Sequence, residues 1–213
     1  MSSVSRLDPA ALRLIAVTDS LREGIDGLAS RAAAAVAGGA TMVQLRLKDE
    51  PPRILVEAAR ALRAAVPGIP LLVSDRADVA LAADADGVHL GSAEIAPAAL
   101  RRAVPARFVI GASVGSDVDV SRVTGADYVG IGPVFATASG TDAGSALGVA
   151  RFAELARACR IPAVAIGGIS PANAASLVEA GAVGVAVISA LFSSADPTLA
   201  ARAFRAALDA NGK

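Results

Sequence analysis

The sequence predicts an α/β protein that folds as a single-domain (β/α)₈ barrel, the TIM-barrel architecture. Eight short apolar runs alternate with eight Ala-rich stretches of helical periodicity along the whole chain. The apolar runs are nearly continuous, which is typical of parallel strands that are buried on both faces. Eight such units are the number that closes a barrel. An open, doubly wound sheet is the alternative architecture.

Each predicted strand is an apolar run bordered by turn residues or charges. In chain order the runs are LRLIAVT (12–18), TMVQLR (41–46), PLLVS (70–74), DGVHL (86–90), RFVIGAS (107–113), ADYVGIG (126–132), IPAVAIG (161–167) and AVGVAVI (182–188). Small or Gly-rich helix ends precede four of them, in GGATMVQL, DADGVHL, GADYVGIG and AGAVGVAV. Glycine at these points takes the left-handed C-cap and lets the chain enter the next strand directly.

The predicted helices lie between these runs. Their ranges are 25–37, 52–65, 77–83, 97–103, 118–123, 149–159, 171–180 and 197–208. Proline stands at the predicted start of four helices, at Pro52, Pro97, Pro171 and Pro197. This placement favours helix starts, because the N–H that proline lacks has no partner in the first helical turn.

Length and charge limit the classes of function. The chain has 213 residues, of which 54% are hydrophobic and 19% charged, so one large core over residues 1–213 is expected. Twenty basic residues balance twenty acidic ones, and no segment concentrates Lys and Arg with aromatic residues. We therefore expect no nucleic-acid partner. Any anion must be bound locally, by a small group of side chains.

Targeting signals and disulfides are not predicted. The N-terminal stretch MSSVSRLDPAAL lacks an apolar region behind a basic start, so it does not resemble a signal peptide. The uncharged run 161–178 contains Pro162, Pro171 and Asn173, which argue against a membrane span. The single cysteine, Cys159, fits a buried helical position better than a nucleophile. A soluble cytoplasmic protein with no membrane partner is expected, and a homo-oligomer is compatible with the sequence.

Polar residues gather on and after the carboxyl ends of the predicted strands, where such barrels carry their chemistry. They are Thr18, Asp19, Gln44, Arg46, Lys48, Ser74, Asp75, Arg76, His89, Ser92, Glu94 and Ser113, followed by the segments GPVFATASGTDAG, GGIS and VIS. In VQLRLK (43–48), Gln44, Arg46 and Lys48 share one face of an extended chain. Cations buried there without an anion would be unfavourable by several kcal/mol, so we expect them to bind one. An edge strand with one solvated face is the alternative.

Two carboxylates at the same end suggest a cation. Asp75 and Glu94, together with Arg46 and Lys48, suit a diphosphate with Mg²⁺ held between its oxygens and the acids. Hard oxygen ligands without Cys or clustered His favour Mg²⁺ over Zn²⁺. Mg²⁺ is therefore the expected cofactor.

A second anion site is predicted near the last two strands. Gly167 and Gly168 open the segment before a predicted helix, and Ile188 and Ser189 follow the last strand. Barrels commonly bind a phosphate there through backbone N–H groups. Plain turn formation by the two glycines is the alternative.

His89, the only histidine, stands at the end of a predicted buried strand. A hydrogen-bonded structural residue is the favoured interpretation, and a general base is the alternative. Every Ser/His/Asp or Cys/His arrangement would depend on it, so nucleophilic acyl transfer is not expected.

The chain resembles the thiamine phosphate synthase family along nearly its whole length. The resemblance rests on AVTD (16–19), GGATMVQLRLKD (38–49), SDRADVALAADADGVHLG (74–91), IGASVGS (110–116), GADYVGIGPVFATAS (125–139), AIGGISPANA (165–174) and GVAVISALF (184–192). It implies a (β/α)₈ barrel and a transferase of thiamine biosynthesis, with two small-molecule substrates. The family joins hydroxymethylpyrimidine diphosphate to thiazole phosphate and releases pyrophosphate.

The resemblance also implies roles for individual residues. The pyrimidine diphosphate would be held by Gln44, Leu45, Arg46, Leu47, Lys48, Ser74 and Ser113, with Arg46, Lys48 and Ser113 as catalytic residues. Asp75 and Glu94 stand in the places of the Mg²⁺ ligands. The thiazole phosphate would be held by Thr137, Ala138, Ser139, Gly140, Gly168, Ile188 and Ser189. Mg²⁺ and the two cations would stabilise the departing diphosphate.

Three positions depart from the family pattern. Ser74 replaces an Asn, and Glu94 replaces an Asp. Gly140 stands where the family has a lysine that binds the diphosphate. Another cation, such as Arg76, would have to supply the charge of that lysine. A related thiazole tautomerase is one alternative function, but its histidine is expected where this chain has Gly115. A non-catalytic paralogue that binds a phosphorylated ligand or a partner protein is the other alternative.

Overall fold

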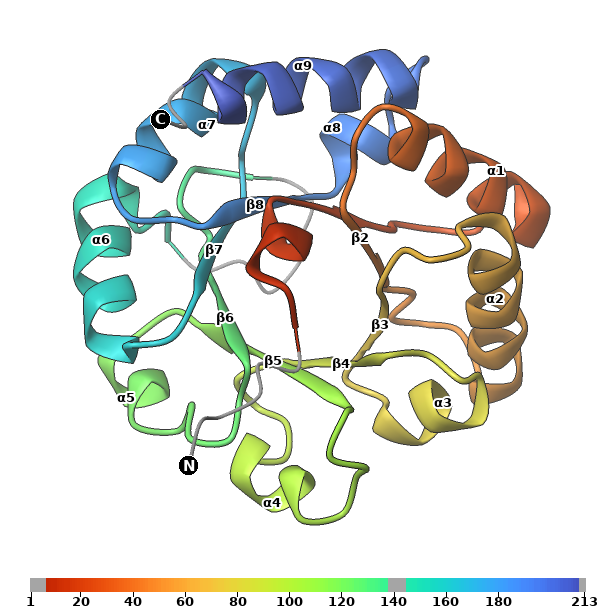
Figure 1. Ribbon diagram of the computed structural model, residues 1–213, viewed down its shortest axis with the longest axis horizontal. Coiled ribbons are helices and arrows are strands. Elements are labelled where there is room, and N and C mark those ends of the chain that lie inside the picture. The colour runs from red at the N-terminus through yellow and green to blue at the C-terminus, as the bar shows by residue number, and fades with distance from the viewer. Residues whose placement is uncertain (1–6, 138–144, 211–213) are drawn as a thin grey trace.

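The computed structural model describes residues 7–137 and 145–210, which form a closed barrel of parallel strands surrounded by helices (Figure 1). The strands are β1 Leu14–Val17, β2 Met42–Leu45, β3 Leu71–Ser74, β4 Gly87–Leu90, β5 Val109–Val114, β6 Tyr128–Ile131, β7 Ala163–Ile166 and β8 Gly184–Val187. Each strand pairs with its neighbours in sequence, and β1 pairs with β8 to close the sheet. The predicted fold class and the positions of the eight strands are confirmed.

Helices surround the barrel on its outside, except for one 3₁₀-helix that precedes β1 and lies over one end of the barrel (Figure 1). They are η1 Pro9–Leu12, a 3₁₀-helix, and α1 Gly24–Ala37, α2 Pro52–Ala65, α3 Ala77–Ala82, α4 Pro97–Arg101, α5 Asp117–Val120, α6 Gly148–Cys159, α7 Pro171–Glu179, α8 Ser189–Phe192 and α9 Pro197–Asp209. The four prolines occupy the first positions of α2, α4, α7 and α9, as predicted. The short elements η1 and α8 are not among the predicted helices.

The predicted strand at 12–18 is wrong at its start. Leu12 belongs to η1, and the Asp8 carboxylate accepts a hydrogen bond from the Ala10 N–H at 2.9 Å to cap that helix. Leu12 is buried with the side chains that fill the barrel interior. Because both the helix end and the strand are buried, hydrophobicity alone does not separate them.

Side chains of the strands enter two apolar layers. The inward set fills the barrel and includes Ile15, Val17, Met42, Leu72, Val109, Tyr128, Val164 and Ala186. The outward set packs in the larger cluster that includes helix residues, and it includes Leu14, Ala16, Val43, Leu45, Leu71, Val73 and Ile110. Since successive side chains of a strand point to opposite faces, burial of both faces explains the continuous apolar runs.

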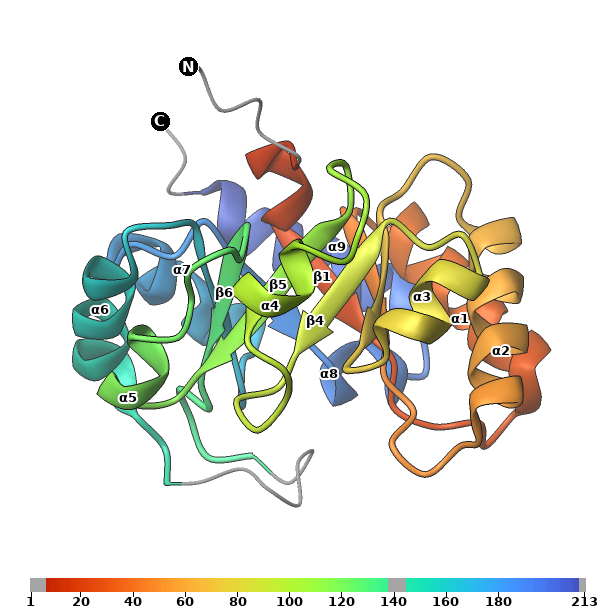
Figure 2. The same ribbon diagram turned by 90° about the horizontal axis from the view of Figure 1, so that it is seen from below.

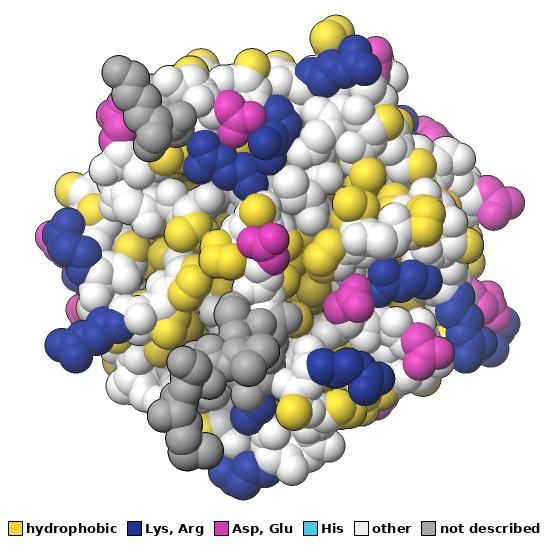
Figure 3. All heavy atoms as spheres, viewed as in Figure 1, with side chains coloured by type: hydrophobic (Ala, Val, Ile, Leu, Met, Phe, Trp, Pro, Cys, Tyr) yellow, Lys and Arg dark blue, Asp and Glu magenta, His cyan; other side chains and the backbone are white. Residues whose placement is uncertain are grey.

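The two ends of the barrel differ in what they carry. In Figure 2, η1 lies at one end, and the loops that follow the strands lie at the other. The face on the η1 side has positive and negative side chains interspersed around its rim (Figure 3). Within residues 7–137 and 145–210, no helix is long and apolar enough to cross a membrane.

Candidate active site

A cavity of about 770 Å³ opens at the carboxyl ends of the strands. Predicted site residues that line it are Gln44, Arg46, Lys48, Ser74, Asp75, Glu94, Ser113 and Ile188. His89 and Tyr128 also line it. Because the barrel is closed and its strands are parallel, the carboxyl ends of all its strands surround the same opening. The structure therefore brings both predicted cations and both predicted carboxylates to a single cavity.

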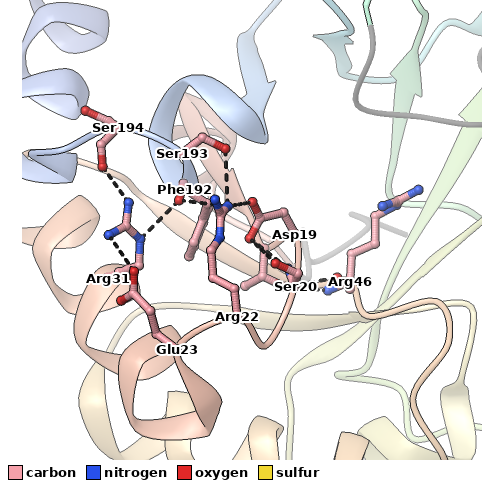
Figure 4. A network of polar contacts seen from close by, with 10 residues as sticks. Asp19, Ser20, Arg22, Glu23, Arg31, Arg46, Phe192, Ser193 and Ser194 are labelled. Carbon is pink, nitrogen blue, oxygen red and sulfur yellow. Dashed lines mark hydrogen bonds and ion pairs between the residues drawn. The ribbon is translucent and has the colours of Figure 1, made fainter.

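Arg46 lies one residue beyond the end of β2, where Thr18 holds its backbone. The buried Thr18 Oγ1 accepts a hydrogen bond from the Arg46 N–H at 2.8 Å and donates to the Arg46 carbonyl at 3.2 Å. In Figure 4 the half-buried guanidinium points away from the Asp19 carboxylate. It makes no hydrogen bond or ion pair with any residue that the structure describes. This arrangement suits a cation that binds an anionic ligand.

The other residues of this segment divide between the cavity and the core. Gln44 is 6% exposed, and its Nε2 donates to Ser74 Oγ at 2.9 Å. Lys48 lines the cavity but is exposed, because β2 has already ended at Leu45, so the expectation of a buried cation is wrong there. The side chains of Leu45 and Leu47 do not line the cavity but pack in the outer apolar cluster.

Asp75 and Glu94 border the same glycine. The Asp75 backbone has a φ of 64°, a left-handed conformation that Asp tolerates better than most residues. Asp75 Oδ1 accepts a hydrogen bond from the Gly91 N–H at 2.8 Å. A Cβ atom on Gly91 would lie 3.3 Å from Asp75 Oδ1 and 3.6 Å from Glu94 Cγ. Both acidic side chains therefore lie beside Gly91, and both line the cavity.

This donor set fits a hard divalent cation. Two carboxylates suit Mg²⁺ when substrate oxygens and water complete its coordination. In the described part of the chain, no three His, Cys, Asp or Glu residues form a metal-binding group, so the protein offers a partial ligand set here. Arg76 does not line the cavity, and its Nε donates to Asp78 Oδ1 at 2.8 Å. It is therefore not positioned to replace a missing cation.

His89 is held by hydrogen bonds from both sides of its ring. Its Nδ1 lies 2.9 Å from the Tyr128 hydroxyl oxygen, and its Nε2 lies 3.1 Å from Ser113 Oγ. Burial lowers the pKa of His89 to about 4, although the nearby Asp75 carboxylate opposes this shift. The imidazole is therefore neutral at pH 7, and the prediction of a hydrogen-bonded residue is confirmed.

A smaller hollow adjoins the large cavity. Thr137, Gly167, Gly168, Ile169, Val187, Ser189 and Ala190 line it, and it shares Ile166, Ala186 and Ile188 with the large cavity. The structure thus brings together Thr137, Gly168, Ile188 and Ser189 from the predicted phosphate-binding set. Three further members, Ala138, Ser139 and Gly140, lie outside the described residues.

Glycine is required where the backbone approaches this hollow. Gly167 and Gly168 have φ values of +96° and +64°. A Cβ atom on Gly168 would lie 2.6 Å from the Ala136 carbonyl oxygen and 2.7 Å from Phe135 Cβ. Both positions therefore need glycine for their backbone conformation, and Gly168 also needs it for its close approach to residues 135 and 136.

Two arginines hold α8, which begins at the smaller hollow, from its other end (Figure 4). Arg31 Nε donates to the Phe192 carbonyl at 3.1 Å. Arg22 Nη2 donates to the same carbonyl at 3.3 Å and to Ser193 Oγ at 3.2 Å, and it also pairs with Asp19. The sequence carries no local signal for this role, because Phe192 follows the two arginines by 161 and 170 residues.

Comparisons with known proteins agree on one family. A family model described as thiamine monophosphate synthase matches residues 14–191. A thiamine-phosphate synthase from Xanthobacter autotrophicus is 47% identical over 204 residues, which cover 94% of this chain and 97% of the relative. A thiamine-phosphate synthase from Methanoculleus marisnigri is 50% identical over 186 residues, with 84% and 88% coverage.

One solved structure agrees with this family, and a more distant one agrees with the fold. A thiamine phosphate pyrophosphorylase from Pyrococcus furiosus is similar with a TM-score of 0.84 and 34% identity, covering 95% of this chain and 98% of that chain. A 3-hexulose-6-phosphate synthase has a TM-score of 0.70 at 20% identity, covers 92% of this chain and 99% of its own, and is similar in fold alone.

Proposed function

Since the chain belongs to the thiamine monophosphate synthase family, we propose that it joins hydroxymethylpyrimidine diphosphate to thiazole phosphate, forming thiamine phosphate and pyrophosphate. It is an enzyme of the transferase class that acts in thiamine biosynthesis, like the thiamine-phosphate synthases that match it at high coverage. The observation that carries the proposal is the convergence of Arg46, Lys48, Asp75 and Glu94 on one cavity. The proposed partners are these small molecules and Mg²⁺, and the proposed compartment is the cytoplasm.

The two adjoining hollows suit two ligands that react with each other. The large cavity, with its cations and carboxylates, has the charges needed for a diphosphate. The smaller hollow, bordered by Gly168 and Ser189, suits a single phosphate that binds to backbone N–H groups and hydroxyls. Because they share Ile166, Ala186 and Ile188, ligands in both would be neighbours. Proximity of this kind lowers the entropic barrier to joining two substrates.

The proposed reaction is a dissociative substitution. The bond between the pyrimidine methylene carbon and the diphosphate oxygen breaks, and the oxygen keeps the electron pair. The thiazole nitrogen then donates its lone pair to the resulting methylene cation and forms the new C–N bond. Since neither step removes a proton from carbon, no strong base is needed, which agrees with a neutral, hydrogen-bonded His89.

The residues of the large cavity would act on the leaving group. Arg46 and Lys48 would bind the diphosphate oxygens and stabilise the charge that they gain as the bond breaks. Ser113 would donate a hydrogen bond to the same group. Asp75 and Glu94 would hold Mg²⁺, which when bound would neutralise part of the diphosphate charge.

The test measures product formation by the chain and by a variant whose new residue tolerates the same backbone conformation. The purified chain is incubated with Mg²⁺ and both substrates, and thiamine phosphate is measured. Asp75→Asn removes the carboxylate charge while keeping a residue that tolerates the left-handed conformation, and it should abolish most of the activity. Asp26→Asn, in the first turn of α1 and outside the cavity, is the matched control and should remain active.

The outcomes separate the alternatives. Thiamine phosphate that depends on Asp75 supports the synthase. Isomerised thiazole phosphate without thiamine phosphate would instead support the tautomerase. Binding of either ligand without any product would contradict the proposed reaction and support the non-catalytic alternative.

A further inference from the structure

The only histidine and the only tyrosine of the chain are in contact inside the barrel, beside Ser113. His89 comes from β4 and Tyr128 from β6, and Ser113 comes from β5, which lies between them. The imidazole bonds to the Tyr128 hydroxyl through Nδ1 and to the Ser113 hydroxyl through Nε2. It therefore connects a buried phenol to a hydroxyl group that lines the large cavity.

Two glycines make room for this arrangement. A Cβ atom on Gly111 would lie 2.5 Å from His89 Nδ1 and 2.5 Å from two ring carbons of Tyr128. A Cβ atom on Gly130 would lie 2.9 Å from His89 Cε1. Atoms at these separations overlap, so larger residues would displace the imidazole. The ring therefore lies in a fitted space, where its two nitrogens have fixed partners.

The protonation of each group limits the direction of the hydrogen bonds. Burial raises the pKa of Tyr128, so the phenol keeps its proton at pH 7. A neutral imidazole has one N–H donor and one acceptor nitrogen. Among the residues that the structure describes, His89 Nδ1 is the only hydrogen-bond partner of the Tyr128 hydroxyl. Tyr128 is 1% exposed although it lines the cavity, and donation to His89 Nδ1 is the arrangement that gives its buried O–H an acceptor within the described protein.

We propose that Tyr128 and His89 are positioning residues that make Ser113 a hydrogen-bond donor toward the cavity. Tyr128 donates to Nδ1, so the imidazole proton resides on Nε2. Nε2–H then donates to Ser113 Oγ, and the Ser113 O–H is left to point at the ligand. In the opposite tautomer, Ser113 would donate to Nε2 and present only lone pairs to the cavity.

This inference rests on the proposed function in one respect, because it takes the ligand beside Ser113 to be the diphosphate. An anionic oxygen accepts hydrogen bonds and is repelled by lone pairs. The direction of the hydrogen bonds from Tyr128 through His89 to Ser113 would therefore decide whether Ser113 favours or opposes diphosphate binding.

The first test reads the tautomer directly and needs no substrate. A long-range ¹H–¹⁵N correlation spectrum of the untagged protein at neutral pH contains a single imidazole, because the chain has one histidine. A protonated Nε2 and an unprotonated Nδ1 are expected. A proton on Nδ1 would overturn the inference even if the synthase activity is real. A proton on Nε2 would support it even if no product forms.

The second test asks whether Tyr128 acts through Ser113. Tyr128→Phe keeps the ring and removes the hydroxyl, and it should raise the KM for pyrimidine diphosphate about threefold to tenfold. In a Ser113→Ala background the same change should have no further effect, because the donor is already gone. Effects that multiply in the double variant would assign Tyr128 a merely structural role and overturn the proposal. Should turnover be absent, the same cycle is measured as affinity for inorganic pyrophosphate with Mg²⁺.

A conservative pair at position 89 gives an independent readout. The His89→Gln side chain can place an amide N–H near the position of Nε2, whereas the shorter His89→Asn side chain cannot. We therefore expect His89→Gln to retain several-fold more diphosphate affinity than His89→Asn. Equal affinity in two variants of equal thermal stability would contradict the need for a donor to Ser113.

Discussion

Arg46 illustrates how neighbours can fix the backbone of a residue that is proposed to bind substrate. The Thr18 hydroxyl makes hydrogen bonds with both the N–H and the carbonyl of Arg46. The guanidinium extends into the cavity and has no ion-pair partner among the described residues. The Thr18 hydroxyl thus fixes the backbone without neutralising the charge. A preorganised cation of this kind stabilises a leaving group without rearranging as charge develops.

Loss of this guanidinium should affect catalysis more than folding. Arg46→Ala is expected to lower kcat/KM about 30- to 1,000-fold, equivalent to about 2–4 kcal/mol of transition-state stabilisation. The melting temperature should change little, because Arg46 is not part of the apolar core. Steady-state kinetics and thermal melts measure both effects. Arg53→Ala, which removes an exposed guanidinium paired with Glu57, is the control, and unchanged turnover in Arg46→Ala would exclude Arg46 from the site.

A missing cation can be restored at one position. Gly140 lies outside the described residues, and the family resemblance expects a lysine there. Gly140→Lys is expected to raise kcat about tenfold, because a charge-assisted contact is typically worth about 1.5–3 kcal/mol. Gly140→Gln adds a side chain without the charge and should not raise the rate. Equal rates in the two variants would mean that charge at this position does not limit the reaction.

At the scale of elements, α8 shows how a short helix is kept in place. An isolated turn of four residues is unstable, so its position depends on tertiary contacts. Arg22 and Arg31 supply these contacts at its carboxyl end, while Ile188 and Ser189 at its start border the smaller hollow. Because α8 has only four residues, displacement of its carboxyl end would also displace its start.

Release of this helix should weaken binding of one substrate selectively. Arg31→Gln removes the charged donor to the Phe192 carbonyl and should raise the KM for thiazole phosphate about threefold to tenfold. The KM for pyrimidine diphosphate should stay nearly constant, because Arg31 lies outside the large cavity. Initial rates with each substrate varied in turn measure the two constants. A parallel rise in both would indicate general destabilisation instead.

At the scale of the whole molecule, the closed sheet connects every strand to two neighbours. All eight strand pairs are parallel and belong to one closed barrel. The strands whose carboxyl ends border the proposed ligand site are therefore the same strands that form the barrel. Binding at the mouth should therefore stabilise the barrel as a whole.

Ligand linkage gives a measurement of this effect. Mg²⁺ with inorganic pyrophosphate at about 100 times its Kd should stabilise the fold by about 2.7 kcal/mol. For a chain of this size, that corresponds to a rise in melting temperature of roughly 5–10 °C. The rise should largely disappear in Asp75→Asn and persist in Asp26→Asn. A rise of the same size in Asp75→Asn would exclude Asp75 from the diphosphate–Mg²⁺ site.

The helices and strands of this chain are more predictable from its sequence than the residues at which they begin and end. The strands and the proline-started helices follow from side-chain periodicity, which acts over a few residues. The exposure of Lys48 and the assignment of Leu12 to η1 were not predictable, because they depend on where barrel packing ends β2 and begins β1. Leu45 and Leu47 belonged to the predicted binding segment, yet strand alternation turns their side chains to the outer layer.

By itself, the sequence determined the order of eight β/α units and the kinds of polar residue that follow each strand. These properties are local, since turn residues and alternating side chains act between near neighbours. Only the tertiary structure decided which distant groups meet. His89 and Tyr128 are 39 residues apart, and Arg31 and Phe192 are 161 apart. Their contacts depend on strand register and barrel closure, which arise when the whole core packs.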